Sequence, residues 1–217
     1  MSDEIDYLLK FIIIGDSCVG KSNIISKFND GTFDENTQPS IGVQFIAKNI
    51  VLDNITFRIQ LWDTAGQENF RAMTKIYYKN CSCAFIVYDI TEKYSFNHLE
   101  TWLNECKKIA PESTIFVLIG NKSDLKENRQ VSYEEGENFA KNNNLLFYEA
   151  SARNGDNIEK IFKESVELIY KKINEGKYNL EDDACGIKKY KSEKNINLDD
   201  YEYQSTKGKV KREKKCC

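Results

Sequence analysis

The sequence is poor in proline, has a single histidine, and contains no long run of apolar residues. Its 217 residues include 2 Pro and 11 Gly, which excludes a collagen-like chain, and 41% hydrophobic residues exclude a wholly disordered one. The longest apolar stretches, at 11–14 and 83–88, are far shorter than the roughly 18 residues that a membrane-spanning helix requires. The acidic start, residues 1–4, has no apolar core and no glycine after the methionine, so we expect neither a secretory signal nor N-myristoylation.

Histidine and cysteine are too few or too scattered for several kinds of chemistry. With His98 as the only histidine, Ser-His-Asp and Cys-His mechanisms are disfavoured, and its place in a helical stretch predicts a structural or surface role. The seven cysteines have no zinc-ligand spacing, and an odd number without a signal indicates a reducing, cytosolic setting. The formal charge of −3 gives no general attraction to nucleic acid, so we expect no nucleic-acid partner.

Buried-strand patterns alternate with helical patterns along most of the chain. The strand segments are 8–14, 83–88, 115–119 and 145–148, and the helical segments are 21–29, 92–109, 132–142 and 156–174. This alternation predicts an α/β fold with a mostly parallel sheet covered by helices on both faces. Residues 43–62 differ, because two alternating runs flank the turn residues Asp53 and Asn54 and predict an antiparallel hairpin at one edge. The prediction is therefore six strands, one of them antiparallel.

The last part of the chain has a different composition. The apolar periodicity fades after Tyr170, so we assign residues 1–176 to the domain and 177–217 to a flexible tail. Six basic residues and one acid occupy 207–215, and the pair Cys216 and Cys217 follows. A solvated tail remains an alternative interpretation of the basic run.

The first strand leads into a phosphate-binding loop. Residues 15–22 satisfy the pattern G-x-x-x-x-G-K-[ST] between a predicted strand and a predicted helix. The backbone N–H groups of such a loop surround the β-phosphate and the helix N-terminus adds positive potential. Lys21 provides a charge for the β- and γ-phosphates, and the hydroxyl of Ser22 is a ligand for Mg²⁺.

Two further motifs follow predicted strands. Asp63 ends one strand and supplies a carboxylate for Mg²⁺, while Gly66 and Gln67 are suited to contact the γ-phosphate and to position water. After another strand, Asp124 of the run 121–124 can accept hydrogen bonds from N1–H and the 2-amino group of guanine, whereas adenine would leave that carboxylate unpaired. Residues 151–153 would complete the base pocket through a backbone N–H.

These motifs, in this order, resemble the Ras superfamily of small GTPases over residues 7 to about 175, and in detail the Rab family. The Rab-like segments are 41–45, 62–68, 77–78 and 88–91, together with the terminal Cys-Cys. Residues 96–99, 118–124 and 186–187 look most like the branch containing Rab-two, Rab-four and Rab-fourteen. The resemblance implies a P-loop NTPase fold of the small G domain type, with GTP and GDP as substrate and product and Mg²⁺ as the cofactor.

The resemblance also implies roles for individual residues. Ser22 and Ser40 would ligate Mg²⁺ directly and Asp63 through water, and the residues implied in catalysis are Gln67, Lys21 and Gly66. The residues implied to bind the nucleotide are Ser17, Cys18, Val19, Gly20, Lys21, Ser22, Asn23, Phe33, Ser40, Gly66, Asn121, Lys122, Asp124, Leu125, Ser151, Ala152 and Arg153. Phe45, Trp62 and Tyr77 match the aromatic triad that Rab proteins present to effectors, with core packing as the alternative.

Partners and location follow from the same resemblance. A Rab-like protein is expected to be a monomer that works with an exchange factor, a GTPase-activating protein, a GDP dissociation inhibitor or escort protein, and effectors. Cys216 and Cys217 would both be geranylgeranylated, and two lipid chains beside a basic segment give a stable membrane anchor. The expected location is the cytoplasmic face of intracellular membranes of the Golgi, endoplasmic reticulum or endosomes, with cycling through the cytosol.

Several positions depart from the Rab pattern, and two other functions stay open. Cys18 stands where many Rab proteins have glycine, and Ser40 replaces a threonine, which predicts a looser GTP-bound switch. Gln44, Asn69 and residues 79–80 differ on the partner-facing surface, so specific partners cannot be transferred by analogy. One alternative is a GTP-binding scaffold with negligible hydrolysis. The other is a P-loop kinase, which residues 121–124 argue against.

Overall fold

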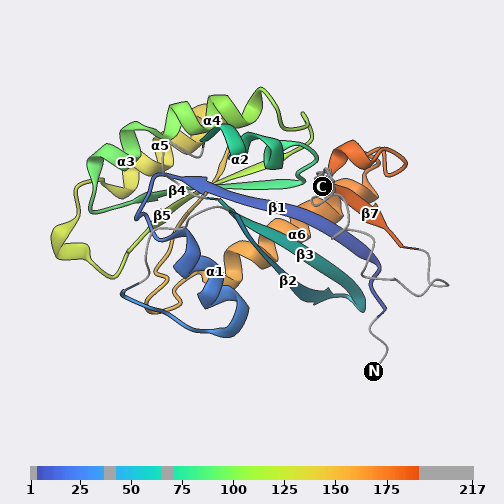
Figure 1. Ribbon diagram of the computed structural model, residues 1–217, viewed down its shortest axis with the longest axis horizontal. Helices are drawn as coiled ribbons and strands as arrows, with labels where there is room; N and C mark the ends of the chain where they lie inside the picture. The colour runs from blue at the N-terminus through green and yellow to red at the C-terminus, as the bar shows by residue number, and fades with distance from the viewer. Residues whose placement is uncertain (1–3, 37–42, 65–70, 191–217) are drawn as a thin grey trace, which may run out of the picture.

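The computed structural model describes residues 4–36, 43–64 and 71–190, which form one α/β domain around a single sheet (Figure 1). The strands are β1 (Tyr7–Gly15), β2 (Val43–Leu52), β3 (Ile55–Thr64), β4 (Cys83–Asp89), β5 (Ile115–Asn121), β6 (Leu146–Glu149) and β7 (Ile187–Lys189). The helices are α1 (Lys21–Asp30), α2 (Arg71–Tyr78), α3 (Lys93–Asn97), α4 (Leu99–Lys107), α5 (Tyr133–Asn143) and α6 (Ile158–Asn174), with short 3₁₀ turns η2 (Lys126–Asn128) and η3 (Asp183–Cys185).

The sheet has the order β2-β3-β1-β4-β5-β6, with β7 added beside β1. β2 and β3 pair antiparallel, as the sequence predicted, and β3, β1, β4, β5 and β6 run parallel. Helices α1 and α6 cover one face and α2 to α5 cover the other (Figure 1). Because the carboxyl ends of the parallel strands meet at one edge, the loops that follow them are brought together there.

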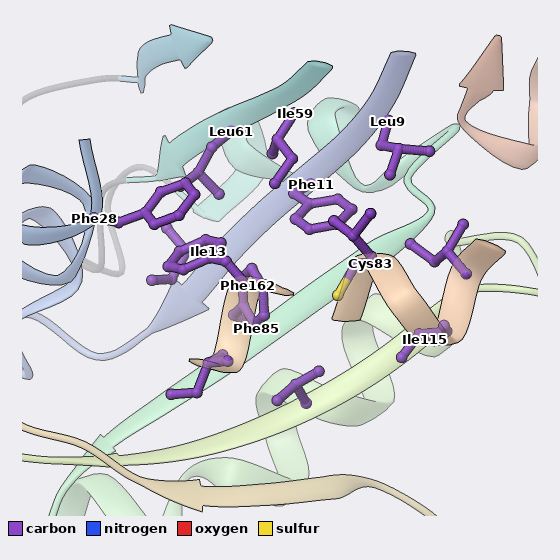
Figure 2. Close-up of a cluster of buried hydrophobic side chains, with 14 of the residues drawn as sticks. Leu9, Phe11, Ile13, Phe28, Ile59, Leu61, Cys83, Phe85, Ile115 and Phe162 are labelled. Atoms are coloured by element: carbon purple, nitrogen blue, oxygen red, sulfur yellow. The ribbon is translucent and has the colours of Figure 1, made fainter. Parts of the chain in front are cut away.

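An apolar core lies between the sheet and helices α1 and α6. Figure 2 shows side chains from β1, β3, β4, α1 and α6 meeting in this layer. The rings of Phe28 and Phe162 stack with centroids 3.7 Å apart, and Phe85 meets Phe162 edge to face at 4.9 Å. Truncating a buried aromatic residue such as Phe162 to alanine costs about 3–5 kcal/mol, so this layer fixes α1 and the loop before it against the sheet.

The helical pattern at 92–109 is divided into two helices. The sequence predicted one continuous stretch, but α3 ends at Asn97 and α4 begins at Leu99. His98 lies between them, where its backbone N–H bonds to the carbonyl of Tyr94 and its own carbonyl accepts from Trp102. In the part of the chain that the structure describes, no helix is both long and apolar enough to cross a membrane.

The segment after α6 is folded onto the sheet as far as Tyr190. The sequence placed the start of a flexible tail at residue 177 and predicted six strands, but β7 is a seventh strand that pairs antiparallel with Tyr7 to Leu9 of β1. Tyr178 and Ile187 are buried in the core. The segment is held by pairing with β1, a tertiary contact that its own charged sequence does not indicate. Residues 191–217, and with them the predicted lipidation sites, lie outside the described part.

Candidate nucleotide-binding site

The loop between β1 and α1 is shaped by two tightly packed glycines. A Cβ on Gly15 would lie 2.3 Å from the carbonyl oxygen of Val87 in β4, so no larger residue fits there. Gly20 has φ +92°, a left-handed conformation that favours glycine, and a Cβ there would lie 2.4 Å from Nδ2 of Asn121. The two close contacts place the loop directly against the carboxyl ends of β4 and β5, and α1 starts at the next residue, Lys21, with the positive end of its helix dipole at the loop.

Lys21 reaches back over this loop. Its Nζ donates to the carbonyl oxygens of Gly15 at 3.0 Å and Asp16 at 2.7 Å. Burial lowers the pKa of Lys21 to about 8, while the carboxylates of Asp63 and Asp16 act in the opposite direction. A buried cation that bonds to carbonyl oxygens at this loop is suited to an anionic ligand, as the predicted phosphate contact requires.

Two of the three predicted Mg²⁺ ligands are in contact. The Ser22 hydroxyl donates to Oδ2 of Asp63 at 2.5 Å, joining the start of α1 to the end of β3. A hydroxyl and a carboxylate are the hard oxygen donors that Mg²⁺ prefers, so the donor set fits this ion. The third predicted ligand, Ser40, lies outside the described residues, as do the predicted catalytic residues Gly66 and Gln67.

Asn121 joins three loops. Its side-chain Nδ2 donates to the carbonyl of Val19 at 2.8 Å, and its Oδ1 accepts from the backbone N–H of Ala152 at 3.2 Å. Asn121 is 1% exposed, so both ends of its amide are satisfied inside the protein. The phosphate loop and the loop after β6 are thereby fixed to the end of β5, as the predicted base pocket requires.

The carboxylate predicted to read guanine is held beside that amide. Oδ1 of Asp124 accepts from the Ser151 hydroxyl at 2.6 Å, so the carboxylate is fixed to the loop after β6. Lys122 forms an ion pair with Asp89 at 2.5 Å, at the end of β4. The contact between Lys122 and Asp89 was not predicted, because the two residues belong to different strand ends.

The remaining predicted contacts lie around the same edge. Asn23 exchanges two hydrogen bonds with the backbone of Asp34, next to Phe33, which packs against the core layer. Cys18 is exposed and has φ +64°. The other predicted residues of this group are Ser17, Val19, Leu125 and Arg153, of which Val19 is buried and Arg153 pairs with Glu35 at 2.7 Å.

The three aromatic residues predicted as an effector surface form one cluster. Trp62 of β3 lies between Phe45 of β2 and Tyr77 of α2, with ring centroids 4.9 and 5.0 Å away. Phe45 is 46% exposed, whereas Trp62 and Tyr77 are partly buried against the core. The cluster therefore combines core packing with an exposed apolar edge.

One set of contacts at this site was missed from the sequence. The carboxylate of Asp16, the second residue of the phosphate loop, bonds to the ring of His98 and to the indole of Trp102. The positions are more than 80 residues apart in sequence, so no local pattern reveals the contact. His98 was assigned a structural or surface role, and this contact connects it to the loop.

A comparison with known protein families agrees with the geometry. The family model described as the Ras family matches residues 10–171, which is well over half of the chain. The chain belongs to the Ras family. It is a small GTPase with the α/β small G domain, a switch of the kind that binds GTP and GDP, generally with Mg²⁺, and generally hydrolyses GTP.

In this Ras-family GTPase, the described residues account for three parts of nucleotide binding. The glycine loop and Lys21 would hold the phosphates, and Ser22 and Asp63 would hold Mg²⁺, which supplies charge neutralisation of the phosphate oxygens. Asp124 would select the guanine base, and Asn121 couples the loop after β6 to the phosphate loop through its hydrogen bonds to Ala152 and Val19.

Proposed function

We propose that this small GTPase is a Rab-type switch that regulates intracellular vesicle trafficking, membrane tethering and fusion by recruiting effectors in its GTP form. The observation that carries the proposal is the aromatic cluster of Phe45, Trp62 and Tyr77. It combines one residue from each of the elements β2, β3 and α2, and these elements border the two segments expected to respond to the γ-phosphate. The motifs at 96–99, 118–124 and 186–187 favour the branch containing Rab-two, Rab-four and Rab-fourteen.

The proposed cycle needs slow hydrolysis. Phosphoryl transfer to water depends on positioning and charge stabilisation, which Lys21, Ser22 and Asp63 would supply, with Gln67 orienting the water. In the described loops at the nucleotide end, Arg129 pairs with Glu149 and Arg153 pairs with Glu35, so we propose that an activating protein supplies the missing charge. That contribution is worth roughly 10³ to 10⁵ in rate. Until GTP is hydrolysed, the γ-phosphate would hold the segments that face binding partners in one arrangement.

The membrane part of the proposal rests on the chain end. Geranylgeranylation of Cys216 and Cys217 beside the basic run 207–215 would anchor the protein on the cytoplasmic face of a Golgi, endoplasmic reticulum or endosomal membrane. A GDP dissociation inhibitor would extract it again, and an exchange factor would reload it with GTP. Each basic residue near an anionic leaflet adds about 1 kcal/mol.

Single-turnover hydrolysis tests the switch. Wild-type protein loaded with GTP and Mg²⁺ is compared with Gln67→Leu, which keeps a similar side-chain volume but cannot orient water. We expect a slow wild-type rate and a rate at least tenfold lower for the variant. Equal rates would instead support a GTP-binding scaffold, and displacement of bound GTP by excess ATP would revive a kinase.

Two measurements test the Rab-type role itself. The GTP-loaded protein should retain a set of binding partners from a membrane fraction that the GDP-loaded protein does not, and Phe45→Ala should lose them while keeping its nucleotide affinity. A tagged full-length chain should lie on internal membranes, and deletion of Cys216 and Cys217 should release it into the cytosol. Retention of the truncated chain on membranes would contradict the lipid anchor.

A further inference from the structure

The Asp16 carboxylate ties the phosphate loop to the helices on one face of the sheet. Oδ1 accepts from Nε1 of Trp102 at 2.7 Å, and Oδ2 lies 2.9 Å from Nδ1 of His98. The indole N–H can only donate, so the direction of the Trp102 bond is fixed. Both donors lie at the N-terminal end of α4, His98 just before its first residue and Trp102 one turn later. One loop side chain is therefore held through both of its oxygens.

The main chain of the same residue contacts the lysine that binds phosphate. The carbonyl oxygen of Asp16 accepts from Nζ of Lys21 at 2.7 Å, and the preceding carbonyl, of Gly15, accepts from it at 3.0 Å. Asp16 is thus fixed from two sides, by α4 through its carboxylate and by Lys21 through its carbonyl. A shift of the carboxylate moves the carbonyl that receives the lysine.

The negative charge of Asp16 in the phosphate loop has to be compensated by hydrogen-bond donors. The Asp16 side chain is 16% exposed, and a partly buried carboxylate close to a phosphate site repels the ligand unless donors compensate for it. Trp102 is 1% exposed in the apolar layer around α4, so its ring packs there with or without the carboxylate. The hydrogen bonds are therefore not needed to hold α4, and their structural effect falls on the loop.

We propose that His98 and Trp102 are positioning residues for the phosphate loop, which hold Gly15 to Lys21 in the shape that retains nucleotide and thereby slow its release. The inference rests on the guanine-nucleotide site and is independent of the Rab-type role. Preorganisation of this kind reduces the ordering that binding requires. Loss of either donor should leave the core intact and accelerate GDP release.

The experiment measures release of fluorescent GDP from the full-length chain in Mg²⁺. Trp102→Phe keeps an aromatic ring and removes the N–H donor, His98→Leu removes the other donor, and His98→Asn restores an N–H. We expect release about three- to tenfold faster for the first two variants and a rate within twofold of wild type for His98→Asn. The matched control is Leu103→Val, on the same helix and fully buried, which loosens the packing without touching Asp16.

A spectroscopic reading separates positioning from general stability. The chain has two tryptophans, so Trp102→Phe identifies the Trp102 indole N–H resonance, and Asp16→Asn should shift it. Wild-type release in both Trp102→Phe and His98→Leu, or equal acceleration in Leu103→Val at a matched melting temperature, would overturn the inference and leave nucleotide binding intact. Failure of the wild-type chain to bind GDP or GTP would instead overturn the nucleotide site and this inference together.

Discussion

Near each end of β1, a glycine with positive φ packs closely against a neighbouring segment, but the two contacts serve different purposes. At its carboxyl end, Gly20 has φ +92° and packs against Asn121, and at its amino end Gly186 has φ +69° and packs against the backbone of Asn80. In each case a Cβ would lie 2.4 Å from the neighbouring atom. Both glycines therefore allow a chain segment to approach the sheet more closely than any other residue would permit.

What surrounds the two glycines differs. The carboxyl end buries polar groups, Lys21, Asp63 and Asn121, which bond to other loops and are arranged for a charged ligand. The amino end buries Tyr178 in the core and pairs Ile187 with Leu9 of β1, so it is stabilised by apolar contact and strand pairing. Close packing around a glycine thus supports binding at one end and folding at the other, and substitutions there should have separable effects.

The largest expected effect is on nucleotide affinity at the carboxyl end. Gly20→Ala adds about 1–2 kcal/mol of left-handed strain and displaces Asn121, whose two hydrogen bonds contribute roughly 1 kcal/mol each. We expect GDP affinity, measured by calorimetry in Mg²⁺, to fall roughly 100-fold. Gly31→Ala is the matched control, because Gly31 has φ +80° and open space around its Cβ. An equal loss of affinity in the control would show that close contact with Asn121 is unimportant.

At the amino end the expected effect is on stability. Gly186→Ala forces its Cβ against backbone atoms of Asn80 and Ser82, and we expect a loss of about 2–3 kcal/mol in the free energy of unfolding. Gly176→Ala has the same φ of +69° with nothing nearby, so it should cost only about 1 kcal/mol. The Lys10 amide, which donates to Gly186, should exchange faster in the first variant, while GDP affinity stays within twofold. A GDP affinity reduced as strongly as by Gly20→Ala would remove the distinction between the two ends.

A smaller effect, again on GDP affinity, should appear when the pH is raised. Burial lowers the pKa of Lys21 to about 8 in the free protein, and contact with phosphate raises it in the complex, so the complex binds more protons above pH 8. GDP affinity should be constant below about pH 8 and fall by up to tenfold per unit as the pH rises above it, measured between pH 7 and 9. Burial also lowers the pKa of Lys10, in the other half of β1, so Lys10→Met should retain the full pH dependence. A wild-type GDP affinity that stays constant between pH 7 and 9 would contradict the assignment of the phosphate contact to Lys21.

The smallest expected effect concerns one hydrogen bond at the amino end. The Tyr178 hydroxyl donates to the carbonyl of Ser113 at 3.1 Å, and Tyr178→Phe removes it without changing the packing. We expect a loss of about 1 kcal/mol or less in the free energy of unfolding by urea, with unchanged GDP affinity. A loss as large as that of Gly186→Ala would mean that the hydrogen bond, and not the glycine contact, holds this segment.

Sequence reasoning succeeded where local pattern and chemistry coincide. The four apolar strands β1, β4, β5 and β6 and the β2–β3 hairpin have apolar or alternating patterns of sufficient length, and the glycine-lysine motif indicates both the shape of its loop and its ligand. It failed for β7, because three residues with two lysines show no strand pattern and depend on pairing with β1. It gave His98 a structural or surface role but did not reveal its contact with Asp16, which bridges 82 positions and is created by the packing of α4 on the sheet.

With the proposed lipid anchor at Cys216 and Cys217, the fold-back of the chain at β7 would limit how far the body of the protein can stand from a bilayer. Because the backbone N–H of Tyr190 bonds to the carbonyl of Asp6 at the amino end of β1, the proposed tether to Cys216 would start there and not at the end of α6. Its 26 peptide steps could stretch to at most ~90 Å, against ~140 Å for a tether that began at Gly176. Releasing β7 from β1 would lengthen this proposed tether by about half with no change in covalent structure.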